Sequence, residues 1–314
     1  MNIHNPIHEI IPQQNNKIIA KKGSNLNRIF RILDNEKTNN SNKIIIKTDS
    51  SSINAMNNLK TQCGGHKGIR QGTKGKYAYI AKPISTDREA LFYRTIKVTP
   101  LYQCVPKYLG ISKDSNNNST NSKSWLLLQD LTSNMSSPCI ADLKIGTRTF
   151  EIDVPQWKQE RQLSLLNGTT TISHAVRCID ICIRHNNTII GQWDRKQGRK
   201  MKWHDFEKAL RVFLSTKAHV EQFTEQLKFL RSKLVETYQE YLPNMRLYSA
   251  SVLIIYDGDK DNSPLTLKLI DFGHGYTDLA SEGGNPHDSS YDDNALLGID
   301  NLLSIADSIS TTFL

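Results

Sequence analysis

Residues 138–146 read Pro-Cys-Ile-Ala-Asp-Leu-Lys-Ile-Gly and place one carboxylate and one ammonium two residues apart in an apolar setting. Residues i and i+2 of a β-strand point to the same face, so Asp142 and Lys144 are predicted to share one side while Leu143 points to the other. The first residue, a proline, suits the start of a strand, and Gly146 permits a close approach or a tight bend. The alternative is a surface strand with one salt bridge, which would contribute little to stability.

Composition limits the class of protein. The chain has 314 residues, enough for about two domains of ~150 residues each. A hydrophobic content of 38% and a charged content of 23% are typical of a globular protein. No run of about 18 apolar residues predicts a membrane span, and the first residues lack the cationic start and apolar core of a signal peptide.

The cysteines indicate a reducing compartment. There are five, with no Cys-x-x-Cys pair: Cys63, Cys104, Cys139, Cys178 and Cys182. This odd, scattered set predicts free thiols inside a cell and no structural zinc. We therefore expect a cytoplasmic location, with the nucleus as a second one.

The net charge of +9 and the pI near 9.2 favour an anionic partner, which could be nucleic acid, a membrane surface or a small polyanion. The aromatic residues are not interleaved with the basic ones, and no helix-turn-helix, zinc finger or RNA-binding signature is present. Nucleic acid is therefore not expected. A charge that serves solubility alone is the remaining alternative.

The first half of the chain alternates strand-like and polar segments. Residues 1–43 are polar and Asn-rich, which is typical of partly disordered chain. Further strands are expected at 44–46, 77–83, 104–111 and 124–128, with a Ser/Asn-rich loop at 112–123. A helix is expected at 86–94, where Thr86 and Glu89 have the spacing of a capping box.

The second half is richer in helical patterns. Apolar residues at steps of three and four predict a core-facing helix over 219–242. Other helices are expected at 155–166, 206–214 and 295–309. Strands at 251–256 and 265–270 are joined by an acidic turn, 257–264, which lacks the glycine and the glutamate of a calcium loop and is read as a hairpin turn.

Asp271-Phe272-Gly273 follows an apolar strand, and kinases hold Mg²⁺ on such a carboxylate. A plain turn is the alternative. The sequence also has a kinase-like order: the strand residue Lys82, the helix residue Glu89, a polar step at Gln129, then the pair at 142 and 144, then Asp271. The glycine loop, the His-Arg-Asp loop and the Ala-Pro-Glu of protein kinases are missing, and so is a Walker A motif.

Residues 138–146 resemble the signature of the inositol polyphosphate kinase family. Four further blocks resemble the family in the right order: 62–66, 249–258, 271–274 and 291–302. The resemblance runs from about residue 55 to the end. Within the family, residues 142–148 and the doubled glycine at 64–65 are most similar to inositol hexakisphosphate kinases, whereas residues 151–167 depart from the subfamilies.

The resemblance implies an α+β, two-lobed, kinase-like fold of the ATP-grasp or protein-kinase kind. It implies an N-lobe at 44–131 with the ATP-binding sheet and a helix, and a C-lobe at 132–314 with an inositol-phosphate-binding segment at 148–203, preceded by the polar, partly flexible segment at 1–43. The implied reaction is the ATP- and Mg²⁺-dependent conversion of inositol hexakisphosphate (InsP6) to a diphosphoinositol polyphosphate. The alternatives are phosphorylation of free hydroxyls of inositol tris- or tetrakisphosphate (InsP3, InsP4) and a non-catalytic polyphosphate- or phosphoinositide-binding protein.

For the nucleotide, the resemblance implies that Lys82 contacts the α- and β-phosphates, oriented by Glu89 unless that residue only caps its helix. Backbone groups of Gln129 and Leu131 would contact adenine. Asp130 would reach the ribose or simply end its strand.

For the metal and the transfer, Asp271 would coordinate Mg²⁺ with support from Ser251. Asp142 would orient or deprotonate the acceptor hydroxyl, or else position the nucleotide. Lys144 would neutralise charge that develops on the transferred group.

The substrate would be a small, dense polyanion held by several cations. The candidates are Lys144, Arg148, Lys158, Arg161, Arg177, Arg195, Arg199, Lys200 and His274. A solvated surface position is the alternative for Arg161 and Lys200. No oligomer is indicated.

Overall fold

The computed structural model describes residues 57–58, 68–74, 77–113 and 123–313. All of them belong to the unit formed by residues 44–314. The predictions made for residues 1–43, 44–46 and 62–66, and for most of the loop at 112–123, lie outside the described residues.

The first of two sheets is antiparallel and has the strand order β1-β2-β3-β5-β4. Its strands are β1 (Asn57–Asn58), β2 (Arg70–Lys74), β3 (Tyr77–Pro83), β4 (Tyr108–Lys113) and β5 (Ser124–Gln129). The helix α3 (Arg88–Ile96) follows β3. The strand predicted from residue 104 is wrong at its start, because Cys104 ends a 3₁₀ turn, Pro100–Cys104, that precedes β4.

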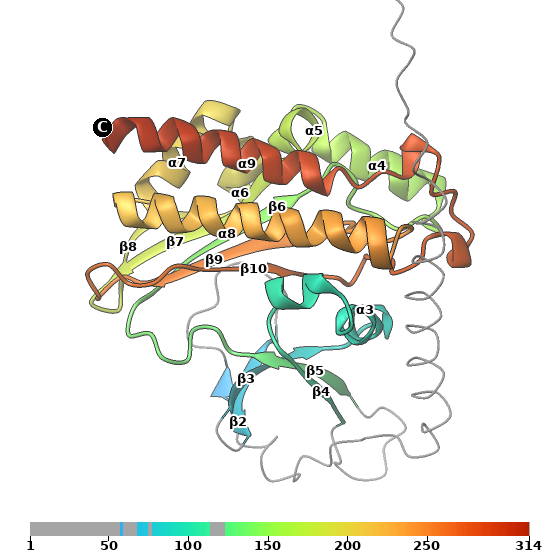
Figure 1. Cartoon of the computed structure of the whole chain (residues 1–314), viewed down its shortest axis with the longest axis horizontal. Coiled ribbons are helices and arrows are strands. Elements are labelled where there is room, and N and C mark those ends of the chain that lie inside the picture. Colours follow the sequence, from blue (N-terminus) through green and yellow to red (C-terminus); the bar gives the residue numbers. More distant parts are fainter. Residues whose placement is uncertain (1–56, 59–67, 75–76, 114–122, 314) are drawn as a thin grey trace, which may run out of the picture. The chain divides into compact units, whose positions relative to one another are not determined.

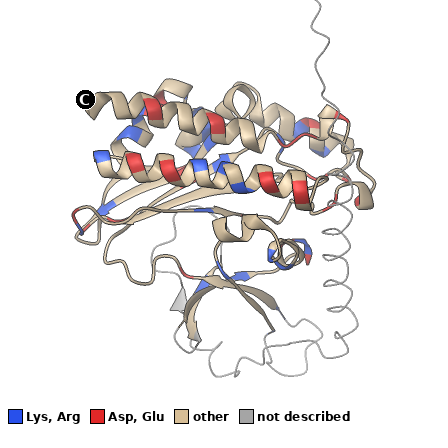
Figure 2. Ribbon diagram, in the orientation of Figure 1, with Lys and Arg blue, Asp and Glu red and all other residues tan. Residues whose placement is uncertain are grey.

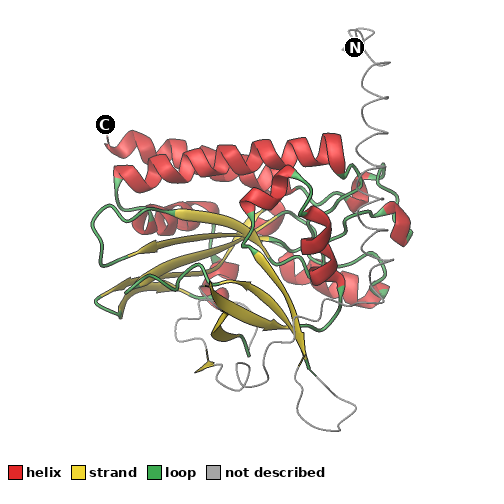
Figure 3. Ribbon diagram, turned by 60° about the horizontal axis from the view of Figure 1, so that its bottom comes forward, coloured by secondary structure: helices red, strands yellow, loops and turns green. Residues whose placement is uncertain are grey.

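The second sheet is also antiparallel, with the order β10-β9-β6-β7-β8. Its strands are β6 (Pro138–Ile145), β7 (Val176–His185), β8 (Thr188–Trp193), β9 (Ser251–Asp257) and β10 (Thr266–Ile270). The strand that carries Asp142 and Lys144 therefore lies at the centre of this sheet. Figure 3 shows the two sheets as separate sets of yellow strands.

Helices pack against the second sheet. They are α5 (Thr170–His174), α6 (Arg195–Lys200), α7 (Trp203–Phe213), α8 (Lys217–Glu236, extended by a π-turn at Thr237–Tyr241) and α9 (Ala295–Ser310). The helix α4 (Gln156–Leu166) is mostly exposed. Figure 1 shows α7, α8 and α9 on one side of the sheet, and α3 with the first sheet on the other. Figure 2 shows charged residues of both signs along α8, and acidic residues alone along α9. None of the described helices is long and apolar enough to cross a membrane.

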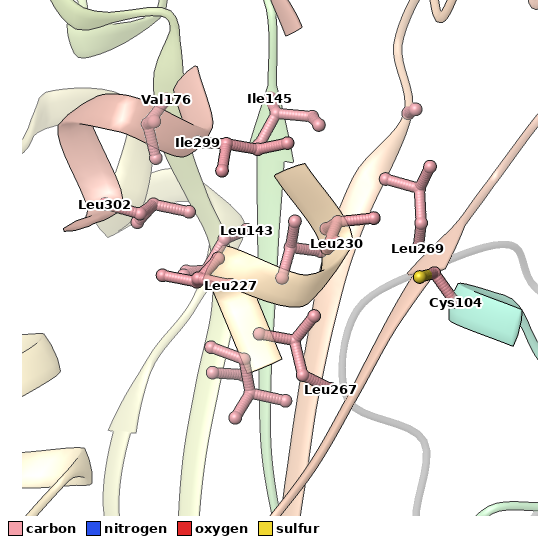
Figure 4. Close-up of a cluster of buried hydrophobic side chains, with 14 of the residues drawn as sticks. Cys104, Leu143, Ile145, Val176, Leu227, Leu230, Leu267, Leu269, Ile299 and Leu302 are labelled. Carbon is pink, nitrogen blue, oxygen red and sulfur yellow. The ribbon is translucent and has the colours of Figure 1, made fainter. Parts of the chain in front are cut away.

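The hydrophobic core explains why β6 runs under these helices. Leu143 and Ile145 of β6 are fully buried in one cluster with Leu227 and Leu230 of α8, and with Ile299 and Leu302 of α9 (Figure 4). Burying each such side chain contributes about 1.5–3 kcal/mol relative to exposure. The apolar stripe predicted over 219–242 is thus confirmed at Val220, Phe223, Leu227, Leu230 and Leu234, which are all buried.

The surface-strand alternative for residues 138–146 is wrong. Every residue of β6 is buried except Lys144, which is partly exposed. The ammonium of Lys144 donates to Ser249, and the described ion pairs do not include one between Asp142 and Lys144. A strand between two others, with both faces covered, has little room for a solvated salt bridge.

Gly146 allows the close approach that its position after β6 predicted. Its φ of +88° lies in the region that glycine adopts without strain. A Cβ at this position would lie 2.4 Å from the carbonyl oxygen of Asp293, which precedes α9. The N–H of Gly146 donates to the carbonyl of Ala175 at 2.7 Å. A side chain here would push α9 away from the end of β6.

The capping box predicted for the helix at 86–94 is wrong. The N-cap of α3 is Asp87 rather than Thr86, and no side chain caps it. The carboxylate of Glu89 instead accepts a hydrogen bond from Lys82 at 3.0 Å. The ion pair between Glu89 and Lys82 thus takes the place of the predicted helix cap.

The two sheets form two lobes that meet through apolar and polar contacts. The ring of Phe92 in α3 stacks on Phe272, with centroids 4.4 Å apart. The ammonium of Lys268 in β10 donates to the carbonyl of Gln103 at 2.8 Å. The chain therefore has the predicted two-lobed α+β architecture, with the segments around residues 82 and 271 close together.

Candidate active site

The register of the second sheet gathers charged side chains on the face turned away from α8 and α9. Residues directly opposite each other in neighbouring strands share a face. Asp142 lies opposite Asp180 of β7, and Lys144 lies opposite Arg177 of β7 and Ser251 of β9. Because Leu143 points into the helix-covered core, these five residues point to the other face, toward the first lobe.

Asp271 enters this group from the end of β10. The strand's last residue, Ile270, lies opposite Ser251, so the next residue emerges beside the same face. Asp271 has a φ of +66°, an uncommon conformation for a residue other than glycine. Phe272 is fully buried against Phe92 and Tyr93. This packing holds the unusual backbone and so fixes the direction of the carboxylate.

Lys82 joins the two lobes through Asp271. Its ammonium lies 2.8 Å from the Oδ1 atom of Asp271 and 3.0 Å from the Oε1 atom of Glu89. Burial alone would lower the pKa of Lys82, but the two carboxylates outweigh it and raise the pKa above its ordinary value. The lysine is therefore held as a cation with a fixed position, next to a carboxylate of the other lobe.

Asp142 is a buried acid with an unsatisfied oxygen. It is 4% exposed, and its Oδ1 atom has no hydrogen-bond partner among the described residues. Burial and the nearby charge of Asp271 raise the pKa of Asp142 to about 6, although Lys144 and the neighbouring Ser251 hydroxyl act in the opposite direction. The hydroxyl of Ser251 is itself buried, and it has no partner within hydrogen-bond geometry among the described residues.

Lys144 is anchored at its tip. Its ammonium donates to the carbonyl and to the hydroxyl of Ser249, both at 2.7 Å. Burial lowers the pKa of Lys144, and the cations Arg177 and Arg195 add to this effect, while Asp271 and Asp142 oppose it. An anion bound beside Lys144 would stabilise its ammonium, which the neighbouring cations destabilise.

We expect the raised pKa of Asp142 to be visible in protein stability, measured without metal and nucleotide. Between the ordinary pKa of 3.8 and about 6, the folded protein keeps a proton that the unfolded chain has lost. The unfolding free energy should therefore fall as the pH rises through this window, by roughly 3 kcal/mol at most for a shift of about two units. Asp142→Asn cannot ionise and should lack this fall.

Chemical denaturation of the wild type and of Asp142→Asn, on both sides of the window, checks this prediction. The difference in unfolding free energy between the two proteins should increase with pH in favour of the variant. Parallel curves would show that Asp142 titrates normally and is not desolvated.

Cations of β7 and α6 lie close to Lys144. Arg177 is 4% exposed, and its Nε and Nη1 atoms lack partners among the described residues. Its burial, together with the charges of Arg199 and Arg195, lowers the pKa of Arg177 to about 10. Gly198 of α6 lies so close to β7 that a Cβ there would be 2.2 Å from the carbonyl of Cys178. This contact brings the exposed Arg195 and Arg199 to the cationic end of the site.

Two residues that were predicted to bind the substrate, Arg148 and His274, contact other groups of the protein. The guanidinium of Arg148 donates to the carbonyls of Phe150 and Ser290, at 3.2 and 2.8 Å, and lies over the ring of Tyr248. His274 forms a 2.6 Å hydrogen bond with the carboxylate of Glu151. Both side chains thus have structural partners, and their part in substrate binding stays a prediction.

The remaining predicted cations are exposed. Lys158 and Arg161 lie on α4, and Lys200 lies at the end of α6. None of the three has an ion pair among the described residues. The structure does not bring these side chains to the central group, and their part in substrate binding also stays a prediction.

The segment that joins the lobes begins at the end of β5. The N–H of Gln129 donates to Lys107, and that of Asp130 donates to Ala78. The carboxylate of Asp130 accepts from the N–H and the hydroxyl of Thr132, at 2.8 and 2.7 Å. Asp130 therefore stabilises its own turn, and its contact with the ribose stays a prediction. Leu131 is partly exposed in this turn.

A divalent cation fits the acidic end of the site. The buried oxygens of Asp142 and Ser251 lack hydrogen-bond partners, and the carboxylate of Asp271 is beside them. Oxygen donors of this kind suit Mg²⁺. Among the described residues, no three His, Cys, Asp or Glu side chains could hold a metal by themselves. The cation would need further oxygens, such as those of phosphates and water.

Sequence reasoning missed Asp180 and Ser249. Asp180 lies in an otherwise mostly apolar strand, and a charged residue in such a strand is a usable signal. Ser249 has a φ of +61°, which no sequence pattern indicated. Lys82, Asp142, Lys144, Arg177, Ser251 and Asp271 are the predicted residues that the structure brings together.

Comparison with known proteins finds a matching family model and several similar proteins. The family model described as inositol polyphosphate kinase matches residues 125–307, more than half of the chain. The chain is 36% identical over 160 residues to inositol hexakisphosphate kinase 1 of Saccharomyces cerevisiae, a match that covers 47% of this chain and 15% of the relative. It is 28% identical over 203 residues to inositol hexakisphosphate kinase 3 of Mus musculus, covering 58% and 50% of the two chains.

Another relative is the inositol polyphosphate multikinase of Schizosaccharomyces pombe, which is 30% identical over 192 residues, with 57% of this chain and 66% of the relative covered. The chain thus spans between about a seventh and two thirds of the length of these relatives. Among solved structures, the inositol phosphate multikinase of S. cerevisiae, in complex with ADP and Mn²⁺, superposes with a TM-score of 0.59 at 23% identity, covering 73% of this chain and 98% of that one. This likeness confirms the two-lobed kinase-like fold.

Proposed function

Because the chain belongs to the inositol polyphosphate kinase family, we propose that it transfers a phosphoryl group from ATP to an inositol polyphosphate with the help of Mg²⁺. The observation that carries the proposal is the pairing of Lys82 with Asp271 across the lobes, beside the Asp142 and Lys144 pair. The related multikinase structure in complex with ADP and Mn²⁺ supports a nucleotide and a divalent metal.

In this mechanism, Lys82 binds phosphate oxygens of ATP, and Glu89 holds its ammonium in place. Asp271, with Ser251 and the free oxygen of Asp142, would hold the metal. The chemistry that Mg²⁺ would supply there is positive charge, which neutralises the phosphates of the nucleotide. Because these groups come from both lobes, binding of the nucleotide and alignment of the lobes would be linked.

Lys144 lies between the acidic end and the cationic end of the face. Its ammonium, held by Ser249, would stabilise negative charge on the group in transfer. Arg177, with Arg195 and Arg199, would bind the phosphates of the inositol ring. Transfer of this kind depends on positioning and charge stabilisation rather than on a covalent intermediate.

The finer proposal is that the acceptor is InsP6 and the product a diphosphoinositol polyphosphate. It is supported by the inositol hexakisphosphate kinases among the relatives and by the resemblance of residues 142–148. The alternative is phosphorylation of a free hydroxyl of InsP3 or InsP4.

Incubation of the protein with Mg²⁺-ATP and a panel of inositol phosphates, with products resolved by charge, tests both levels of the proposal. Turnover of any member supports the kinase reaction, and the preferred member identifies the acceptor. Turnover of InsP3 but not of InsP6 would replace the finer proposal with the alternative. No turnover of any member would leave a non-catalytic polyphosphate-binding protein.

A further inference from the structure

The imidazole of His274 is held by a carboxylate from a distant part of the chain. Its Nδ1 atom lies 2.6 Å from the Oε1 atom of Glu151, which is separated from it by 123 positions in the sequence. Glu151 lies in the loop after β6, and His274 lies in the loop after β10. The contact therefore joins the two loops that follow the strands bringing Lys144 and Asp271 to the site.

The backbone on both sides of Glu151 is fixed by other hydrogen bonds. Before it, the guanidinium of Arg148 donates to the carbonyl of Phe150 at 3.2 Å. After it, the N–H of Ile152 donates to the hydroxyl of Tyr276, also at 3.2 Å. The loop therefore does not depend only on the contact between the carboxylate and the imidazole, and that contact is available for a further role.

The carboxylate determines which nitrogen of His274 carries hydrogen. The hydrogen bond from the imidazole lowers the pKa of Glu151 to about 2, against the effect of burial and with help from the charge of Arg88. Glu151 is thus ionised at neutral pH and can only accept hydrogen bonds, so Nδ1 must be the donor. The hydrogen bonds of the described residues include none to Nε2, and 45% of the side chain is exposed. Nε2 is therefore the atom that His274 offers to a ligand.

A carboxylate behind an imidazole has two opposite effects on a polyanion. It holds the ring in one orientation and stabilises its protonated form, which donates from Nε2. A donor that is oriented in advance loses less rotamer freedom when the ligand binds. The same carboxylate also repels a polyanion directly. If Glu151 had no part in binding, only the repulsion would remain, and its removal would tighten the complex.

We propose that Glu151 is a positioning residue that orients and stabilises the imidazolium of His274, so that Nε2 donates to a phosphate group of the inositol polyphosphate. The second proton of the imidazolium comes from solvent. The inference rests on the proposed function, because it takes the ligand to be an inositol polyphosphate. It deepens that function by making the Glu151–His274 contact a part of the binding site rather than a competitor for the ligand.

Isothermal titration calorimetry with InsP6 tests the sign of the effect. Glu151→Gln keeps the size of the side chain but removes its charge. We expect it to weaken InsP6 binding about tenfold, a change of about 1.4 kcal/mol in binding free energy. A carboxylate that only repels the ligand predicts tighter binding instead. ADP with Mg²⁺, titrated in parallel, should bind with unchanged affinity, whereas a general loss of structure would weaken both ligands.

Three further variants separate the positioning role from other effects. Asp153→Asn removes the same charge from an exposed position of the same loop and should not weaken InsP6 binding. Glu151→Asp keeps the charge and should recover part of the affinity that Glu151→Gln loses. In a His274→Gln background, Glu151→Gln should no longer weaken binding, because the carboxylate acts through the imidazole.

Unchanged or tighter InsP6 binding by folded Glu151→Gln, or by Glu151→Ala if the first variant does not fold, would overturn the inference. The same weakening in the His274→Gln background would also overturn it, and so would a wild type that binds no inositol phosphate. Failure of the proposed function has a different signature, which is absent phosphoryl transfer from Mg²⁺-ATP. A protein that shows the expected shift in InsP6 binding but transfers no phosphate would retain the role of Glu151 and lose the kinase proposal.

Discussion

Asp271→Asn is expected to reduce phosphoryl transfer about 1,000-fold or more, which corresponds to about 4 kcal/mol of lost transition-state stabilisation. The carboxylate of Asp271 lies at the end of β10 and accepts a hydrogen bond from Lys82 of the first lobe. An amide keeps the shape of the side chain but binds a divalent cation weakly. The site would therefore lose its principal metal ligand while the surrounding packing is unchanged.

The fold should survive this substitution. Asp271 has a φ of +66°, and asparagine tolerates this conformation better than most residues. The amide oxygen can still accept the hydrogen bond from Lys82, and Glu89 still pairs with the ammonium. We expect a change in unfolding free energy of about 1 kcal/mol or less, as is usual when one neutral hydrogen bond replaces a charged one.

Rates of transfer from Mg²⁺-ATP, together with thermal unfolding curves, check the prediction. Asp307→Asn is a matched control, because it removes the same charge from an exposed position of α9 and should leave the rate unchanged. A rate near that of the wild type would remove Asp271 from the metal site. A collapse of stability would instead assign Asp271 a mainly structural role as the partner of Lys82.

Sequence periodicity predicted the parts of the fold that depend on local burial. The alternation in residues 138–146 correctly separated Leu143 from Asp142 and Lys144, because a strand buried on both faces still directs neighbours to opposite sides. The stripe over 219–242 likewise predicted α8. In both cases the pattern reflects the pitch of a single element, so no knowledge of distant contacts was needed.

Sequence could not predict which partner each polar side chain would find. The register shift between β6 and β7 places Asp180 opposite Asp142, and this depends on how two strands that are distant in the sequence align. Arg148 and His274 lie in or next to matching motifs, yet Arg148 is engaged by the carbonyl of Ser290 and His274 by the carboxylate of Glu151, both of them distant in the sequence. A motif fixes the type of residue, whereas tertiary packing decides what its charged end contacts.

The residue that best connects the fold with the proposed chemistry is Lys144. Its burial penalises the charged form, and the neighbouring cations add to this cost, so an ammonium here destabilises the empty protein. A bound anion would compensate for this cost. Removing the charge should therefore reduce activity strongly and change stability little, which distinguishes a functional cation from a structural one.

Lys144→Met is expected to lower the rate of transfer by about 10²–10³-fold, as loss of one donor to a transition-state charge does. Methionine fills the space of the lysine stem without its desolvation cost. The acceptors of Ser249 lose their donor, which offsets part of that gain, so the unfolding free energy should stay within about 1 kcal/mol of the wild-type value. Steady-state rates and denaturation of the same samples measure both effects, with Lys228→Met on the exposed side of α8 as the control. If Lys144→Met keeps its rate but loses several kcal/mol of stability, then the ammonium serves to tie β6 to Ser249, and the stabilisation of the transferred group must come from Lys82 or Arg177.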